Sequence, residues 1–212
     1  DNGLLRPGQQ ISFVSPTPVK FPDTTKIKLY ALNEDKQTVK PYSFKADASN
    51  SCILYMKADL KQGETYLFVA DSAAFKNLWG ERSDSAGVKF SIRKDDSFGS
   101  LKMNITNYEG NRVVQLLTKE EKTVREITMQ KTGSADFKLL DKGIYRLRNI
   151  YDLNGDGKWT TGDFLTGRQP EPVSFFPMEI EIKENWNLNN DWDISKQQAK
   201  VLKPSAVKAA GR

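Results

Sequence analysis

The sequence predicts an all-β protein built as two tandem antiparallel β-sandwiches. Three observations carry this expectation. Apolar residues alternate with polar ones over short stretches, turn-forming residues separate those stretches, and no segment keeps the 3.6-residue apolar period of a long helix. At 212 residues, the chain is long enough for two such domains.

The first domain is expected over residues 1–97, with about seven short strands. Apolar residues alternate in residues 10–14, 26–31 and 88–92, whereas Ser51–Lys57 and Thr65–Ala70 are nearly continuous apolar runs, as in strands covered on both sides. Pro41 predicts a sheet edge or a strand break because proline cannot donate a ladder hydrogen bond. Ser72–Leu78 is the one short helical candidate, with Gly80 as its end.

The second domain is expected over residues 98–193. Alternation recurs in Leu101–Ile105, Thr123–Met129 and Ile144–Arg148, and two further strands are predicted between prolines near residues 173–182. We interpret residues 194–212 as a basic tail, in which Ile194–Val201 could form two helical turns before a proline stops them.

The net charge of +5 belongs to one end of the chain. Residues 194–212 contain five basic residues and no acidic one, and the rest of the chain holds 27 basic and 27 acidic residues. A nucleic-acid-binding domain usually presents a basic stripe on its folded surface. We therefore expect no nucleic-acid partner. No apolar run approaches the ~20 residues of a membrane-spanning helix.

The sequence has one cysteine and no histidine. This excludes an intramolecular disulfide, a Cys/His zinc site and histidine-based acid–base catalysis within this chain. Only carboxylates could then catalyse, as in glycoside hydrolysis, and no pair of them stands out among the turns. The chain is therefore expected not to be an enzyme.

Residues 152–163 are the one segment whose spacing specifies a chemistry. Oxygen-bearing side chains fall at positions 1, 3, 5, 9 and 12, and a glycine lies at position 6. A hard cation such as Ca²⁺ needs oxygens that converge on one point around a sharp turn. The expected calcium ligands are the side chains of Asp152, Asn154, Asp156 and Asp163, the backbone carbonyl of Lys158, and Thr160 either directly or through water.

Two features separate this loop from a helix–loop–helix calcium site. Position 12 is Asp163, which is shorter than the usual glutamate, and residues 144–150 before the loop are predicted as a strand. The alternative is a hairpin loop that is rich in Asn, Asp and Gly because these residues tolerate turn geometry. If the loop binds metal, we expect a structural Ca²⁺ that locks one end of the second sandwich.

Trp186 and Trp192 lie in a stretch of amides and carboxylates. Aromatic faces beside such groups can bind sugars, so both tryptophans are candidates for ligand contact. The other interpretation is that the segment plugs its tryptophans into the end of the sandwich, because a buried tryptophan supplies much apolar area. Trp79 and Trp159, each beside a turn glycine, are interpreted as packing anchors.

The first half resembles bacterial Ig-like domains of the SbsA type. The residues that carry this likeness are Pro7–Phe13, Pro18-Val19, Asp23–Leu29 and the Leu60-x-x-Gly63-x-x-Tyr66 turn. The second half is similar to the prealbumin-like sandwich of carboxypeptidase-regulatory and collagen-adhesin repeats. Its likeness rests on Gly99-Ser100-Leu101 and Leu140–Arg148. The two resemblances imply an Ig-like sandwich followed by a prealbumin-like one.

Tyr151–Asp163, followed by Gln169–Val173, resembles the C-terminal ends of Ig-like surface lipoproteins from Bacteroidetes. The resemblance implies a secreted or surface-anchored, non-enzymatic protein whose signal and lipid anchor precede this segment. The chain begins without a methionine, so we expect a processed or truncated fragment of a longer protein.

These observations together predict a structural or adhesive module of a secreted or cell-surface bacterial protein. The alternative is a carbohydrate-binding accessory module that uses exposed tryptophans. The expected partner is a protein or a glycan at the cell surface, and a membrane only through an anchor outside this chain. The expected location is extracytoplasmic, at the cell surface, at the outer membrane or in the periplasm.

Overall fold

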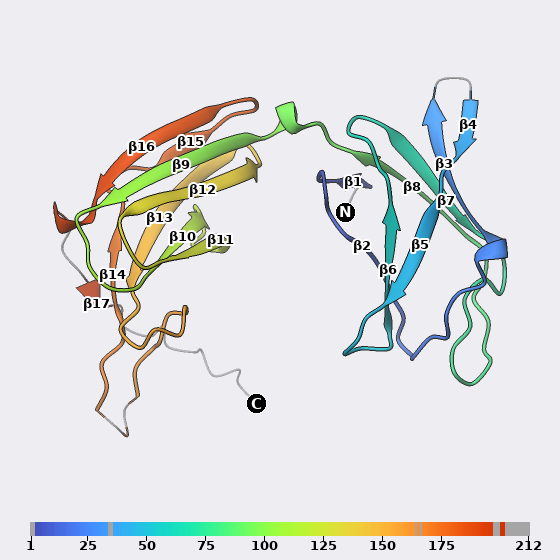
Figure 1. Ribbon diagram of the computed structural model, residues 1–212, viewed down its shortest axis with the longest axis horizontal. Coiled ribbons are helices and arrows are strands. Elements are labelled where there is room, and N and C mark those ends of the chain that lie inside the picture. Colours follow the sequence, from blue (N-terminus) through green and yellow to red (C-terminus); the bar gives the residue numbers. More distant parts are fainter. Residues whose placement is uncertain (1–2, 34–35, 164, 166, 197–199, 202–212) are drawn as a thin grey trace, which may run out of the picture. The chain divides into compact units, whose positions relative to one another are not determined.

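The computed structural model describes residues 3–33, 36–163, 165, 167–196 and 200–201, and over these residues the protein is all-β (Figure 1). The predicted fold class is confirmed. Helical structure in the described residues is limited to three 3-10 turns, η1 (Thr24–Lys26), η2 (Asp95–Ser97) and η3 (Ile194–Lys196). None of the described helices is long and apolar enough to cross a membrane.

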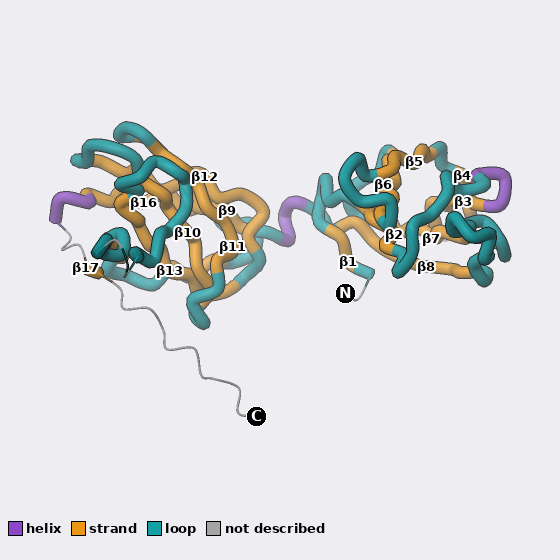
Figure 2. The backbone as a smooth tube through the Cα atoms, turned by 90° about the horizontal axis from the view of Figure 1, so that it is seen from below, coloured by secondary structure: helices purple, strands orange, loops and turns teal. Residues whose placement is uncertain are grey.

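The chain divides into two compact units, Asp1–Asp95 and Asp96–Arg212. Figure 2 shows the two groups of strands with the loops that connect them. The division falls within two residues of the boundary expected at 97/98. Each unit contains two sheets and its own hydrophobic core.

The first unit pairs a five-stranded sheet with a three-stranded one. The larger sheet has the order β1 (Leu4–Leu5), β8 (Ala86–Ile92), β7 (Thr65–Ala70), β3 (Ile27–Asn33) and β4 (Lys36–Val39). The smaller has the order β2 (Ile11–Val14), β6 (Ile53–Ala58) and β5 (Tyr42–Ala46). Neighbouring strands are antiparallel except β1 and β8, which run parallel.

The period-two alternation seen in the sequence places the core of this unit. Ile27, Leu29 and Ala31 of β3 are buried, and the lysine and tyrosine between them are not. Phe13 of β2 meets Phe68 of β7 with the ring centroids 4.8 Å apart, which joins the two sheets. The strand break predicted at Pro41 is also present, because β4 ends at Val39 and β5 begins at Tyr42 in the other sheet.

The helix predicted over Ser72–Leu78 is wrong. The backbone groups of this segment bond to other segments instead: the Lys20 amide donates to the Lys76 carbonyl at 2.8 Å, and the Ala73 amide donates to the Ser83 carbonyl at 2.8 Å. Ala73 also has a φ of 62°, which no α-helix accommodates. Short apolar runs of this length do not distinguish a helix from a packed loop.

The second unit pairs a six-stranded sheet with a three-stranded one. The larger sheet has the order β11 (Thr123–Met129), β10 (Arg112–Thr118), β13 (Gly143–Tyr151), β14 (Pro172–Phe175) and β17 (Lys200–Val201), and β15 (Ile180–Ile182) also pairs with β13. The smaller has the order β12 (Gly133–Leu140), β9 (Gly99–Thr106) and β16 (Asn187–Asp193). β16 runs parallel to β9, and the other neighbours are antiparallel.

Strand β10 is buried on both faces, and this positions the acidic loop, which is the connection between β13 and β14 (residues 152–171). Val114 and Leu116 enter the main core, whereas Val113 belongs to a second small cluster with Ile150 and Val173. Trp159 of the acidic loop packs against that cluster. The loop between β13 and β14 therefore covers the outer face of the larger sheet.

The two helical turns predicted over Ile194–Val201 are not found in the described residues. Ile194–Lys196 forms a single 3-10 turn, and Lys200–Val201 forms β17, which pairs with Pro172 and Val173. Residues 197–199 and 202–212, most of the predicted basic tail, lie outside the described residues.

Candidate functional sites

The acidic loop connects β13 to β14 and spans residues 152–171 (Figure 1). The strand predicted ahead of it is confirmed as the end of β13. Asp152, the first loop residue, is 4% exposed. Its Oδ1 accepts the Gly155 amide at 2.7 Å and its Oδ2 accepts the Gly157 amide at 3.0 Å. Gly157 has a φ of 74°, so the glycine at position 6 provides the expected sharp turn.

A second buried carboxylate, Glu171, holds the loop from its other end. Glu171 is 4% exposed; its Oε1 accepts the Leu153 amide at 2.9 Å and its Oε2 accepts the Thr160 amide at 2.9 Å. The Trp159 indole donates to the Glu171 carbonyl at 3.1 Å. Sequence reasoning missed this residue because Glu171 lies eight positions beyond the metal-type spacing, in a segment where no local pattern marks it.

The side chains at positions 3, 5 and 9 of the loop lie together. Asn154 Nδ2 donates to Asp156 Oδ2 at 2.9 Å and to Thr160 Oγ1 at 3.0 Å. The Lys158 amide donates to Asp156 Oδ1 at 2.8 Å. The hydrogen bond from the Lys158 amide is the largest cause that lowers the pKa of Asp156, and the one from Asn154 comes next. Both keep the Asp156 carboxylate ionised. The structure thus gathers part of the predicted oxygen cluster.

Asp163, at position 12, has a different role in the structure. It forms a two-way backbone pair with Arg168, with both N–O distances 2.9 Å, and its Oδ1 accepts the Leu165 amide at 2.9 Å. Across the described residues, no group of three or more Asp, Glu, Cys or His side chains is placed to hold a metal ion. Calcium binding by Asp152, Asn154, Asp156, Lys158, Thr160 and Asp163 stays a prediction.

The structure separates the two tryptophans that were candidates for ligand contact. Trp192 is 2% exposed and packs edge-to-face on Phe176, with the ring centroids 5.6 Å apart. Trp192 is a core residue and cannot contact a surface ligand, so the prediction that it is a candidate for ligand contact is wrong. Trp186 is 44% exposed, and Lys183 Nζ lies 4.7 Å from its ring centroid.

The remaining tryptophans also differ from each other. Trp159 packs against the small cluster under the acidic loop, as expected of a packing anchor. Trp79 is 71% exposed, so its interpretation as a packing anchor is wrong. Asn77 Oδ1 accepts the amides of Trp79 and Glu81 at 3.0 and 2.9 Å, and these bonds build a turn that carries the indole outside the core.

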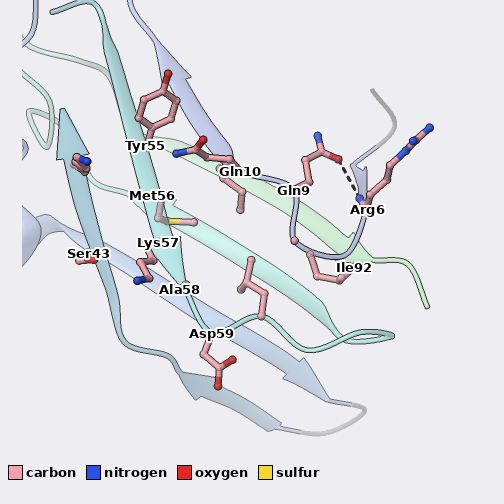
Figure 3. Close-up of a pocket in the computed structure, with 14 residues that line it drawn as sticks. Arg6, Gln9, Gln10, Ser43, Tyr55, Met56, Lys57, Ala58, Asp59 and Ile92 are labelled. Carbon is pink, nitrogen blue, oxygen red and sulfur yellow. Dashed lines mark hydrogen bonds between the residues drawn. The ribbon is translucent and has the colours of Figure 1, made fainter. Parts of the chain in front are cut away.

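The first unit has a hollow of about 540 Å³ where the chain passes from β1 to β2 (Figure 3). Because β1 and β2 belong to different sheets, the connecting residues leave a gap beside β6 that the sequence pattern could not reveal. The Arg6 amide donates to Gln9 Oε1 at 3.0 Å across this connection. Buried Met56 and Ile92 line the hollow together with charged and amide side chains from Arg6, Gln9, Gln10, Lys45, Lys57 and Asp59.

No protein-family model matches this sequence, and no curated protein matches it. Among solved structures, the chain is similar to the major pilin subunit of Bacillus cereus, with 13% identity and a TM-score of 0.30 over 84% of this chain and 60% of the pilin. It is also similar to the pilus 2b backbone protein of group B streptococcus, with 9% identity and a TM-score of 0.25 over 87% of this chain and 90% of that one.

The present chain spans about 60% of the length of the Bacillus cereus pilin that it matches. At these identities and TM-scores, neither match carries an argument about activity. The assignment to all-β tandem sandwiches rests on the strand pairing itself.

Proposed function

We propose that this chain is a non-enzymatic structural or adhesive module of an extracytoplasmic, cell-surface bacterial protein. One observation carries the non-enzymatic part of the proposal. Five carboxylates in the described residues have a shifted pKa; all five pKa values are lowered, and in each the largest cause is a hydrogen bond from a residue two positions away. These residues are Asp23, Asp47, Glu120, Asp156 and Asp193.

The direction of these shifts supports a structural role for the carboxylates. A general acid at neutral pH needs a raised pKa, which burial or a neighbouring like charge provides. A carboxylate that accepts hydrogen bonds from its own turn is held ionised and is used to build that turn. The two most buried acids, Asp152 and Glu171, are likewise engaged with backbone amides.

We also propose that Ca²⁺ stiffens the second unit through the acidic loop. Side-chain oxygens of Asp156 and Thr160 lie 3.5 Å apart, and Nδ2 of Asn154 donates to both of them, which brings the three side chains together. Asp152 and Glu171 add two buried carboxylates to the same loop. A hard cation matches this oxygen-rich donor set, and it would offset the repulsion between the carboxylates.

The surface assignment is tested on intact cells that produce the full-length protein. An antibody against this chain should label intact cells, and proteinase K added outside should remove the labelled epitope without cell lysis. Labelling that requires permeabilised cells, together with an epitope that survives the protease, would contradict the assignment. The Bacteroidetes lipoprotein resemblance predicts in addition that the labelled protein carries a lipid anchor.

A further inference from the structure

The outer face of the three-stranded sheet in the second unit is polar along β9, β16 and β12 up to Lys138. On each strand, every second side chain in this stretch points away from the core, and none of these side chains is apolar. The strand register places these residues side by side, with Asp136 opposite Lys102 and Lys102 opposite Asn189. The outward residues are Ser134, Asp136 and Lys138 on β12, Ser100, Lys102 and Asn104 on β9, and Asn187, Asn189 and Asp191 on β16.

Hydrogen bonds within this face fix the direction of its amides. Asn104 Nδ2 donates to Asn189 Oδ1 at 3.1 Å and to Asp191 Oδ1 at 2.7 Å, and the Ser100 hydroxyl donates to Asn187 Oδ1. The oxygens of Asn187 and Asn189 are therefore used within the protein, and their Nδ2 groups are left as donors. Holding these groups in place before binding lowers the entropy cost of recognising a ligand.

This face is hollowed beside β16. A groove of about 350 Å³ is lined by the polar residues Ser100, Lys102, Asp136, Lys138, Asn187 and Asn189, and also by Leu101, Phe137 and Leu188. In the described part of the chain, the side chains of Lys102, Asp136 and Lys138 form no hydrogen bond or ion pair. One carboxylate acceptor and two ammonium donors are therefore available at the groove. The groove offers both donors and acceptors, and its charges are of mixed sign.

An aromatic residue, Trp186, is next in the chain to the residues that line the groove. Trp186 immediately precedes Asn187, and its backbone carbonyl accepts the Ser100 amide at 2.7 Å, which ties its backbone to two residues of the groove lining. Its indole is 44% exposed. An exposed indole can cover the apolar C–H face of a sugar ring, while the polar groups beside it bind the hydroxyls.

We propose that this groove, with Trp186, binds a hydroxyl-rich oligosaccharide of low net charge. A nucleic acid or a strongly acidic glycan would require a surface of one sign, whereas this groove carries Asp136 as well as two lysines. A stable protein interface would require an apolar centre, which the outward residues do not provide. The inference deepens the proposed adhesive function and rests on it.

The first test uses affinity electrophoresis of the whole chain in gels that contain soluble galactomannan, arabinoxylan or dextran. The groove predicts retardation by at least one polysaccharide. Trp186→Ala and Asn189→Ala should each weaken that binding by about tenfold, as expected for the loss of a stacking face or a preset donor. Trp79→Ala is the matched control, because it removes an exposed tryptophan from the other unit and should bind like the wild type.

Asp136→Asn is a third groove variant that should fold normally, because it keeps the size of the side chain and removes only the charge. It should weaken binding while the melting temperature of the chain stays unchanged. Retardation that all three groove variants retain would overturn the inference. If no gel retards the chain, and if its binding to cell envelopes survives periodate in the second test described below, the inference is also overturned.

The second test separates a failure of this inference from a failure of the proposed function. The labelled chain is added to envelopes of the producing cells before and after periodate, which destroys sugar diols, and before and after protease. Loss of binding after periodate alone supports the groove. Loss after protease alone overturns the groove and leaves the adhesive function with a protein partner. Absence of binding to untreated envelopes contradicts both.

Discussion

Glu171 and Thr160 are joined by two hydrogen bonds that tie the middle of the acidic loop to its last residue. The Thr160 amide donates to Glu171 Oε2 at 2.9 Å, and the Glu171 amide donates to the Thr160 carbonyl at 3.0 Å. Because Glu171 directly precedes β14, this pair fixes the loop to the larger sheet of the second unit. A buried carboxylate that satisfies several amides is expensive to replace.

Glu171→Gln is therefore expected to destabilise the second unit by about 1–3 kcal/mol. A glutamine retains one acceptor oxygen, and its NH₂ group would face an amide that needs an acceptor. The free energy of unfolding from urea denaturation measures the effect. Glu179→Gln, at an exposed position ahead of β15, is the matched control and should change little. Equal stabilities of the two variants would show that Glu171 does not hold the loop.

Trp192→Ala is expected to cost about 3–5 kcal/mol of unfolding free energy, because it removes a large side chain from a closed core and leaves a cavity beside Phe176. Trp79→Ala should stay within about 0.5 kcal/mol of the wild type, since the indole lies mostly in solvent. Urea denaturation of both variants makes the comparison. A Trp192 variant as stable as the Trp79 variant would contradict the core placement.

The sequence predicted the strands well because the side chains themselves alternate where one face is buried. β3 and β9 show this pattern plainly, with Leu29 and Leu101 inside and lysines between the apolar positions. The parallel pairings of β1 with β8 and of β9 with β16 could not be predicted, because they join segments far apart in the chain. Strand alternation carries no information about which distant segment is the neighbour.

The candidate sites were only partly predictable for the same reason. The spacing of Asp152, Asn154 and Asp156 is a local signal, and the structure does place the side chains at positions 3, 5 and 9 together. Glu171 enters the loop through tertiary contact, and the groove beside β16 exists only once three strands are side by side. Whether a tryptophan is buried also depends on partners distant in sequence, as Trp79 and Trp192 illustrate.

Tyr66 makes the stability of the first unit sensitive to alkaline pH. Its hydroxyl donates to Glu64 Oε2 at 2.7 Å and accepts the Lys61 amide at 2.8 Å, and burial raises its pKa from 10.0 to about 12. A raised tyrosine pKa favours the protonated form in the folded state. This contribution to stability is complete below pH 10 and is lost as the pH rises towards 12.

Tyr66→Phe should remove that part of the pH dependence between pH 10 and 12 and lower the stability at neutral pH by about 1 kcal/mol. Urea denaturation of the wild type and the variant at pH 8, pH 10 and pH 11 compares the two. Tyr30→Phe, a partly exposed tyrosine of β3, serves as the control. Parallel stability curves for the wild type and Tyr66→Phe across this range would refute the assignment.

We expect Ca²⁺ to bind the acidic loop and to stabilise the second unit. Calorimetric titration of the whole chain with Ca²⁺, paired with thermal melts, tests this most directly. Binding heat and a melting temperature that rises in millimolar Ca²⁺ are predicted, with both effects reduced in Asp156→Ala. Mg²⁺ at the same concentration should do less, because it demands a tighter octahedral shell. No heat and an unchanged melt in Ca²⁺ would contradict the claim.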